Sequence, residues 1–260
     1  MNMAIHEADV FAYQSDKYAA ARPKYPPELF RYLASLVKQC GSVWDCATGS
    51  GQTALGLSKY FKRVEATDIS TNQIEHAFAH DKITYSVQSS EKTNFPDQTF
   101  DMVNVSQALH WFDLDKYWVE LRRVLKPGGI FVATTYAWSN VSQEIDDLIF
   151  KYIREVIEPY WAPNNQHCID GYSSIDFPFE LLDTPEFVIL NKWNLEQYFD
   201  YIYTWSATKS CLDAEGSEFF ELAKDRVSKL WGNSSRKRRV ITPLAVIAGR
   251  DLLNRFNEVQ

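Results

Sequence analysis

A short loop in the first third of the chain carries residue types that suit binding of a charged ligand. An apolar run from Val43 ends in Asp45, and the segment CATGSG then brings Gly49 and Gly51 before a helical pattern begins. Glycine lacks the Cβ that keeps a ligand away from the backbone, and the first N–H groups of a helix have no partner inside it. The pattern therefore predicts a strand, a tight turn and a helix start that cradle a nucleotide-sized ligand.

A second acid follows at the distance expected for a ribose contact. The run VEATDIS predicts a second strand that ends at Asp68, about 20 residues after the loop, where a carboxylate can accept hydrogen bonds from ribose hydroxyls. The alternative is that Asp68 caps a helix or a turn. The loop reads acid-x-Ala-x-Gly-x-Gly and lacks the first glycine of the dinucleotide fingerprint GxGxxG, which disfavours a nicotinamide oxidoreductase.

With the loop and both acids, the chain resembles the class I S-adenosylmethionine (SAM) dependent methyltransferases of the type 11 group. That family holds its cofactor with an acid-x-Gly-x-Gly loop and an acid that closes the second strand. Two further segments resemble the trans-aconitate methyltransferase branch: YAAARPKYP from Tyr18 and SQALHWF from Ser106. A third, ELRRVLKPGG from Glu120, resembles the family's approach to its fifth strand. The resemblance runs from about Phe11 to Arg250 and implies SAM as cofactor, with S-adenosylhomocysteine (SAH) as product.

The resemblance also implies which residues contact SAM. Asp45 and the glycine loop would hold its amino acid end, Asp68 the ribose, and residues 89–91 the adenine. The chain departs from the family at Ala47, where many members have glycine, and at Ser89, where a carboxylate is common. The predicted cofactor contacts are Tyr18, Arg22, Asp45, Ala47, Thr48, Gly49, Ser50, Gly51, Asp68, Ile69, Gln73, Ser89, Ser90, Glu91, Gln107 and Ala108.

The chemistry of methyl transfer limits what the acceptor side needs. Displacement at a sulfonium requires an acceptor lone pair in line, about 3 Å from the methyl carbon, so positioning can supply much of the rate. A carboxylate acceptor, with an ordinary pKa of about 4, needs no general base near neutral pH. For other acceptors His110 is the candidate base, and the equal alternative is that its hydrogen bonds pin a loop.

The side chains expected around the acceptor are aromatic or cationic. Arg22 or Lys209 would orient an acid, unless each is a surface charge with a buried stem. For Trp111 and Trp205 the alternative is plain core packing. The predicted acceptor contacts are Arg22, Tyr25, His110, Trp111, Tyr136, Trp138, Trp205 and Lys209.

Alternating strand and helix patterns must position these residues. Prolines 26 and 27 favour the start of a helix, and Ser70 is a plausible N-cap. Further helices are predicted over residues 53–60, 113–126, 141–157, 194–212 and 215–230. The other predicted strands cover residues 83–91, 100–105, 130–138, 187–193 and 239–250.

The resemblance implies a Rossmann-like α/β fold with a seven-stranded, mostly parallel sheet. Its last strand would be antiparallel, helices would cover both faces, and a helical, aromatic cap would be added. We expect a single methyltransferase domain over residues 1–260, with a core of about 27–138, 185–193 and 239–250. The cap would comprise residues 1–26, 139–184 and 194–235.

Composition limits the remaining possibilities. The formal net charge of −7 argues against a surface that tracks phosphates, the cysteines lack metal-ligand spacing, and no apolar run reaches the ~18 residues that cross a bilayer. We expect a cytoplasmic monomer or weak homodimer that acts on a small molecule, without nucleic acid, membrane or metal. The favoured reaction is O-methylation of a carboxylic acid. Alternatives are C- or N-methylation of a hydrophobic small molecule, a non-catalytic SAM-binding domain, and a nicotinamide oxidoreductase.

Overall fold

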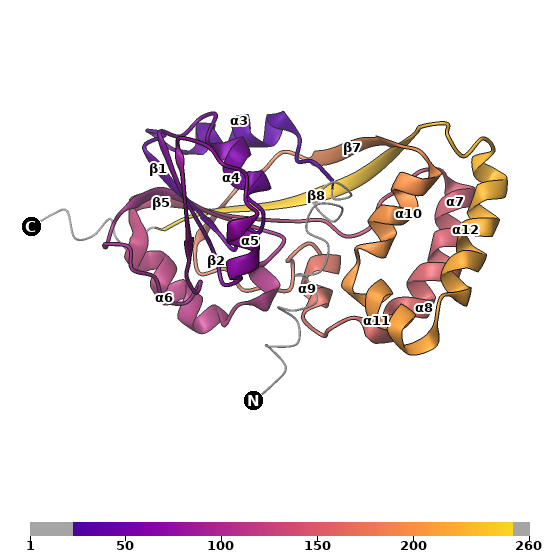
Figure 1. Ribbon diagram of the computed structural model, residues 1–260. Coiled ribbons are helices and arrows are strands. Elements are labelled where there is room, and N and C mark those ends of the chain that lie inside the picture. The colour runs from indigo at the N-terminus through magenta and orange to yellow at the C-terminus, as the bar shows by residue number, and fades with distance from the viewer. Residues whose placement is uncertain (1–22, 252–260) are drawn as a thin grey trace, which may run out of the picture. The chain divides into compact units, whose positions relative to one another are not determined.

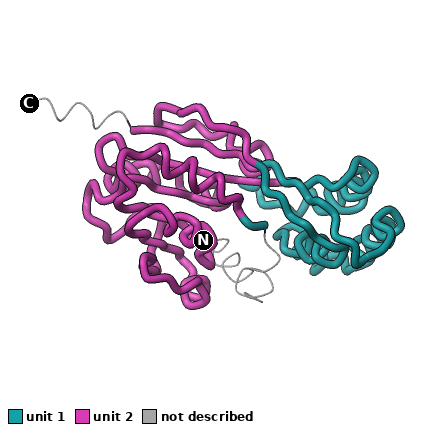
Figure 2. Tube along the Cα trace, turned by 90° about the horizontal axis from the view of Figure 1, so that it is seen from above, with its two compact units in different colours: residues 1–24, 138–166, 188–243 teal, residues 25–137, 167–187, 244–260 magenta. Residues whose placement is uncertain are grey.

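The computed structural model describes residues 23–251. Tyr18 and Arg22 lie outside the described residues, so their predicted roles stay predictions. The chain divides into two compact units (Figure 2). Unit 1 comprises residues 1–24, 138–166 and 188–243, and unit 2 comprises residues 25–137, 167–187 and 244–260. Relative to the predicted core and cap, the strand at 188–193 falls in unit 1 and residues 167–184 fall in unit 2.

A mixed sheet organises the described strands, and its parallel part carries the predicted ligand loop (Figure 1). The path is β3-β2-β1-β4-β5-β8-β6, with β7 paired to β8 outside it. Pairings from β3 to β5 are parallel, whereas β8 is antiparallel to β5 and β6, so the Rossmann-like fold is confirmed. The strands are β1 (Ser42–Cys46), β2 (Arg63–Asp68), β3 (Ile83–Val87), β4 (Phe100–Ser106), β5 (Leu125–Thr135), β6 (Glu180–Leu182), β7 (Phe187–Trp193) and β8 (Arg238–Arg250).

The sheet of the described residues has eight strands, one more than predicted. The additional strand is β6, whose three residues are too few to show a period of two in the sequence. A second difference is that β5 begins at Leu125 and includes the Pro-Gly-Gly segment, whereas the predicted strand began at residue 130. Its pairing with β4 is irregular there, because the register shifts between Phe100 and Met102.

Three helices of unit 2 begin where the sequence supplies a proline or a capping side chain. α3 (Pro27–Leu36) has proline in its first turn, which fixes φ without losing a hydrogen bond. In α5 (Thr71–Glu75) the Ser70 side chain accepts from the Gln73 N–H, as predicted for an N-cap, and Asp113 caps α6 (Leu114–Val124) in the same way. α4 (Gln52–Leu57) and the 3-10 turn η1 (Leu109–Trp111) complete this set.

Both faces of the sheet in unit 2 are packed. On one face Trp44 and Phe131 belong to a buried cluster that includes Tyr117 and Leu121 of α6. On α4, Gly56 lets the ring of Phe30 from α3 approach so closely that an added Cβ would meet it at 2.1 Å. These contacts fix the carboxyl ends of β1, β2 and β4, where the predicted ligand residues lie.

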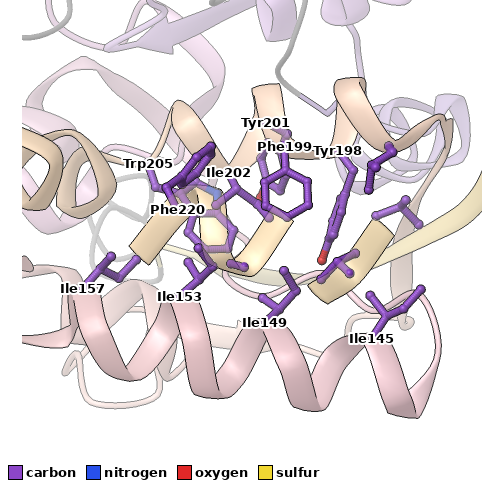
Figure 3. Packing of buried hydrophobic residues seen from close by; sticks show 14 of the residues in the cluster. Ile145, Ile149, Ile153, Ile157, Tyr198, Phe199, Tyr201, Ile202, Trp205 and Phe220 are labelled. Atoms are coloured by element: carbon purple, nitrogen blue, oxygen red, sulfur yellow. The ribbon is translucent and has the colours of Figure 1, made fainter. Parts of the chain in front are cut away.

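Unit 1 is built around one long helical segment. α7 (Gln143–Ile149), the π-helix η2 (Phe150–Arg154) and α8 (Glu155–Ile157) follow without a gap, as predicted for residues 141–157. The buried residues Ile145, Ile149, Ile153 and Ile157 recur every four positions and face Tyr198, Phe199, Trp205 and Phe220 (Figure 3). On a regular α-helix this spacing would drift by about 40° per step. The wider π turns reduce the drift, so all four side chains reach one core.

The predicted helix over residues 194–212 is two helices. α10 (Leu195–Tyr203) and α11 (Ser206–Glu215) are separated at Thr204 and Trp205, where Trp205 has ψ 133°. The Thr204 hydroxyl donates to the Tyr201 carbonyl, which satisfies one acceptor at the helix end. The remaining helical pieces are η3 (Glu158–Tyr160), α9 (Asn165–Ile169) and α12 (Glu218–Trp231). None of the helices in the described range is long and apolar enough to cross a membrane.

Candidate functional site

The loop after β1 has the backbone shape that its composition predicts. Ala47, Gly49 and Gly51 have φ of 54°, 56° and 84°, all in the left-handed region that favours glycine. At Gly51 there is also no room for a side chain, since an added Cβ would lie 2.2 Å from the Tyr85 hydroxyl oxygen. The loop is therefore a tight backbone turn in which only Ala47 carries the strain of a non-glycine residue.

Asp45, near the end of β1, stabilises this loop through hydrogen bonds. Its side chain is buried, and its two oxygens accept hydrogen bonds from the Thr48 hydroxyl at 2.5 Å and the Asn104 amide at 2.7 Å. Burial raises the pKa of Asp45 to about 6, and the hydrogen bonds from Thr48, Asn104 and the Ala54 backbone only partly offset this. Asp45 thus connects β1, the loop and β4 through a largely ionised carboxylate at neutral pH.

Asp68, at the end of β2, reaches the same loop from the neighbouring strand. Its carboxylate accepts the Gly49 N–H and the Ser70 N–H, each at 2.9 Å. Burial raises the pKa of Asp68, while these backbone bonds lower it. Each carboxylate oxygen has a second lone-pair site, so two further donors such as a pair of vicinal hydroxyls can still be accepted.

The residues predicted around an adenine lie at the ends of β2 and β3. Ile69, directly after Asp68, is 74% exposed and offers an apolar face beside the carboxylate. The Ser89 hydroxyl donates to Glu91, and the other Glu91 oxygen accepts the Asp113 N–H at 3.2 Å. Ser90 lies between them in the same turn. The Glu91 carboxylate is thus used to hold this turn against the start of α6.

Gln107 joins the ends of β4 and β5. It has a left-handed φ of 58°, and its side-chain amide donates to the Tyr136 carbonyl at 2.7 Å and accepts the Tyr136 N–H at 2.9 Å. Tyr25 lies with its ring 6.2 Å from that of Tyr136, edge to face. Burial raises the pKa of Tyr25, so its hydroxyl is protonated. Ala108, the next residue and also a predicted cofactor contact, is buried.

His110 is enclosed by a segment that sequence reasoning did not connect with it. Its Nδ1 atom lies 2.9 Å from the Cys168 thiol and 3.3 Å from the Tyr172 hydroxyl. Burial, and to a smaller extent His167, lower the pKa of His110 to about 3. The imidazole is therefore neutral across the physiological range. Trp111 lies against it, with ring centroids 4.7 Å apart.

The chain reversal after α9 aims Tyr172 at His110. The Tyr172 N–H donates to the His167 carbonyl and the Gly171 N–H to the Cys168 carbonyl, the bond pattern of a Schellman helix end. Both Gly171 and Tyr172 have positive φ, 67° and 66°, and the Tyr172 side chain is fully buried. A non-glycine residue pays a strain cost in this conformation. No local motif in the sequence announces such a turn except Gly171 itself.

Comparison with known proteins decides the family. A profile described as a methyltransferase domain matches residues 44–133. A solved structure from Anaeromyxobacter dehalogenans, assigned as a type II methyltransferase, is 37% identical and covers 88% of this chain and 97% of that chain, with a TM-score of 0.83. The chain belongs to the class I SAM-dependent methyltransferases.

Two more distant proteins agree with this membership. A Dictyostelium discoideum protein assigned as a methyltransferase is 27% identical to this methyltransferase over 240 residues, which is 90% of each chain. The YcgJ protein of Bacillus subtilis is 17% identical, with a TM-score of 0.52 over 86% of this chain and 98% of that chain, and shares the fold. Because the chain belongs to this family, the alternative that it is a nicotinamide oxidoreductase is wrong.

The loop geometry of this methyltransferase fits SAM. Gly49 has open space where a Cβ would be, with Gln73 the nearest atom at 3.9 Å, so a ligand can approach the backbone. Asp68 keeps acceptor capacity for ribose hydroxyls. Asp45, in contrast, is so enclosed by Thr48 and Asn104 that its evident role is to hold the loop. A direct contact between Asp45 and SAM stays a prediction, as do the other assigned contacts.

The predicted acceptor residues fall in both units. Tyr25, His110, Trp111 and Tyr136 belong to unit 2, and Trp138, Trp205 and Lys209 belong to unit 1. Trp205 is buried in the unit 1 core and packs edge to face on Tyr201. This position agrees with the alternative interpretation of Trp205 as a core residue. Among the described residues no group of three or more metal-ligating side chains is placed to hold an ion.

Proposed function

We propose that this enzyme transfers the methyl group of SAM to a carboxylate oxygen of a small-molecule acid, the reaction expected for the trans-aconitate branch. The family membership supports SAM-dependent methyl transfer. The motif SQALHWF supports the branch. The proposal therefore concerns the acceptor: its class, its reacting atom and its small size.

The observation that carries the proposal is the state of His110. Its pKa is lowered to about 3, and its Nδ1 atom is already engaged by Cys168 and Tyr172. A general base works best with a pKa near the operating pH, so this imidazole is poorly suited to remove a proton. An acceptor that is ionised before it binds makes the missing base unnecessary.

The proposed reaction balances without a proton transfer. Bound SAM supplies an electrophilic methyl group on a positively charged sulfur. A lone pair of the carboxylate oxygen forms the new O–C bond while the S–C bond breaks, and its electrons remain on sulfur as the neutral thioether of SAH. The protein's contribution is then to hold the two reactants in line and to exclude water.

A second candidate is C- or N-methylation of a hydrophobic small molecule. The observation in its favour is the aromatic group of unit 1, in which Trp138 lies edge to face with Trp161 at 6.0 Å and Trp205 at 5.4 Å. Such surfaces bind apolar ligands. This reaction would require a base for many acceptors. Among the residues that we assign to the site, His110 is the candidate base.

Transfer of radioactive methyl from SAM to a panel of acids and amines tests the proposal. We expect turnover with di- or tricarboxylates such as trans-aconitate, and a product that releases methanol in mild alkali, because it is an ester. The rate should stay level from about pH 7 to 9, since the acceptor is ionised throughout this range and Asp45, with its pKa raised to about 6, is largely ionised. Label that is stable to alkali, or turnover only with neutral acceptors, would contradict the carboxylate assignment.

A further inference from the structure

Arg154 of unit 1 is a cation in an unusual setting. Its guanidinium carbon lies 3.9 Å from the ring centroid of Trp138 and 5.1 Å from that of Phe150. The side chain is half-buried, and its Nε atom is fully enclosed without a hydrogen-bond partner. Burial lowers the pKa of Arg154, yet an arginine remains charged at physiological pH. A positive charge is thus kept beside an aromatic surface.

No carboxylate among residues 23–251 forms an ion pair with Arg154, although Glu158, the first residue of the 3-10 turn η3, is only four residues further along the chain. The guanidinium instead lies over Trp138, which precedes the helix. By contrast, Arg123 of unit 2 pairs with both Asp97 and Glu120. Within the described residues no carboxylate compensates the charge of Arg154, so the guanidinium can pair with a carboxylate of a ligand.

The contact with Trp138 orients the guanidinium without using its donors. A cation over an aromatic face is attracted by the ring, and the attraction is stronger when the pair is partly desolvated. The N–H groups on the two terminal nitrogens of the planar guanidinium remain able to bind both oxygens of one carboxylate. Trp138 is itself fixed by edge-to-face contacts with Trp161 and Trp205. The group is therefore preorganised, which lowers the cost of binding.

The backbone that carries Arg154 is also unusual. Arg154 is the last residue of the π-helix η2, and the neighbouring Ile153 is buried in the core shown in Figure 3. π turns are rare and occur often at functional sites. Here the wider turn keeps Ile153 in register with Ile149 and Ile157, and it sets the direction in which Arg154 leaves the helix.

We propose that Arg154, held over Trp138, is a carboxylate-binding site of unit 1. Its ligand is a small organic acid whose carboxylate accepts two hydrogen bonds from the guanidinium while its carbon skeleton contacts the indole. The further statement that this acid is the methyl acceptor rests on the proposed function. The site takes the acid-orienting role that the sequence suggested for Arg22 or Lys209.

Direct binding of acids to the full-length enzyme loaded with SAH tests this site. The probes are trans-aconitate, succinate and benzoate, followed by tryptophan fluorescence and calorimetry, with trimethyl trans-aconitate as the uncharged match. Arg154→Met should raise the dissociation constant of the best acid at least 10-fold. Arg154→Lys should raise it about 3-fold or more, because an ammonium lacks the planar fork. Binding of the uncharged ester should not change.

Lys151→Met is the matched control, since Lys151 is an exposed cation on the same π-helix. It should leave acid binding unchanged, and SAH affinity, which reports the cofactor residues of unit 2, should be unchanged in every variant. Acid binding that is equally tight in Arg154→Lys and wild type, or wild-type enzyme that binds none of the three acids, would overturn the site. Arg154-dependent binding without any methyl transfer would leave the site standing and overturn the proposed function instead.

Discussion

Two partly buried charged groups, one in each unit, are treated differently by the fold. Asp68 in unit 2 has its carboxylate held by the N–H groups of Gly49 and Ser70. Arg154 in unit 1 has an aromatic ring on one face and no hydrogen bond to any residue between 23 and 251. A charge that the protein itself compensates is positioned before a ligand arrives. A charge that the protein leaves uncompensated gains the most interaction free energy when a ligand of opposite charge binds.

This difference matches the two roles that the enzyme must combine. The cofactor is the same in every turnover, so a rigid set of backbone amides and carboxylates suits it. The acceptor distinguishes this enzyme from others of its fold, and function resides in such added groups rather than in the fold. We therefore expect changes in unit 2 to affect SAM and SAH first, and changes around Arg154 to affect the acid alone.

The largest expected effect comes from Asp68→Ala. It removes a charged acceptor for ribose hydroxyls and also frees the Gly49 N–H that shapes the loop. Hydrogen bonds to charged groups contribute about 1.5–3 kcal/mol each, so SAM affinity should fall about 100-fold or more in calorimetry. Asp81→Ala, which changes an acid that is 87% exposed, should have no effect. If Asp68→Ala binds SAM as tightly as wild type, Asp68 does not bind the ribose, and the contrast drawn here between Asp68 and Arg154 fails.

A smaller effect is expected from Gly51→Ala. The added Cβ would meet the Tyr85 hydroxyl at 2.2 Å in a residue whose φ is 84°. Backbone strain of about 1–2 kcal/mol together with a displaced Tyr85 should weaken SAM binding about 10-fold. Gly128→Ala is the matched control, since Gly128 has φ 70° and no atom within 4 Å of the added Cβ.

The cause of the Gly51 effect is separable by a second change. In a Tyr85→Phe background the atom at 2.2 Å is absent, and the nearest ring carbon is 3.0 Å away. Part of the lost affinity should therefore return. If Gly51→Ala binds SAM as tightly as wild type, the loop of unit 2 is not preformed in the sense argued above.

The cofactor side of unit 2 was predictable because its signals are local. Asp45, Gly49 and Asp68 occupy the ends of successive parallel strands, and strands of one sheet bring such ends together whatever follows. The N-cap of α5 and the proline start of α3 follow from neighbouring residues in the same way. The length of β6 and the early start of β5 depend on pairing with distant strands, which no local pattern reports.

The acceptor side was less predictable because its contacts join distant residues. Cys168 and Tyr172 meet His110 across about 60 residues of chain, after a segment with little periodicity. Arg154 lies on a π turn and contacts Trp138, and sequence spacing alone does not distinguish a π turn from an α turn. The predicted single helix through Trp205 was wrong for a related reason: burial of its indole overrides helix propensity at that point.

The smallest effect on turnover is expected at His110, which tests whether a group already paired inside unit 2 takes part in chemistry. Its pKa of about 3 lies below the ordinary 6.5, so the folded enzyme binds fewer protons than the unfolded chain. The resulting stabilisation is complete above about pH 6.5 and is lost as pH falls from there towards 3. His110→Gln should therefore make the free energy of unfolding less dependent on pH between 7 and 4, as followed by urea denaturation. Turnover of a carboxylic acid should fall less than about 3-fold, with an unchanged pH profile, because an imidazole with a pKa of about 3 is too weak a base to remove a proton efficiently. A loss of 100-fold or more in kcat with SAH affinity intact, together with a wild-type profile that bends near pH 6.5, would make His110 the base and favour the C- or N-methylation alternative.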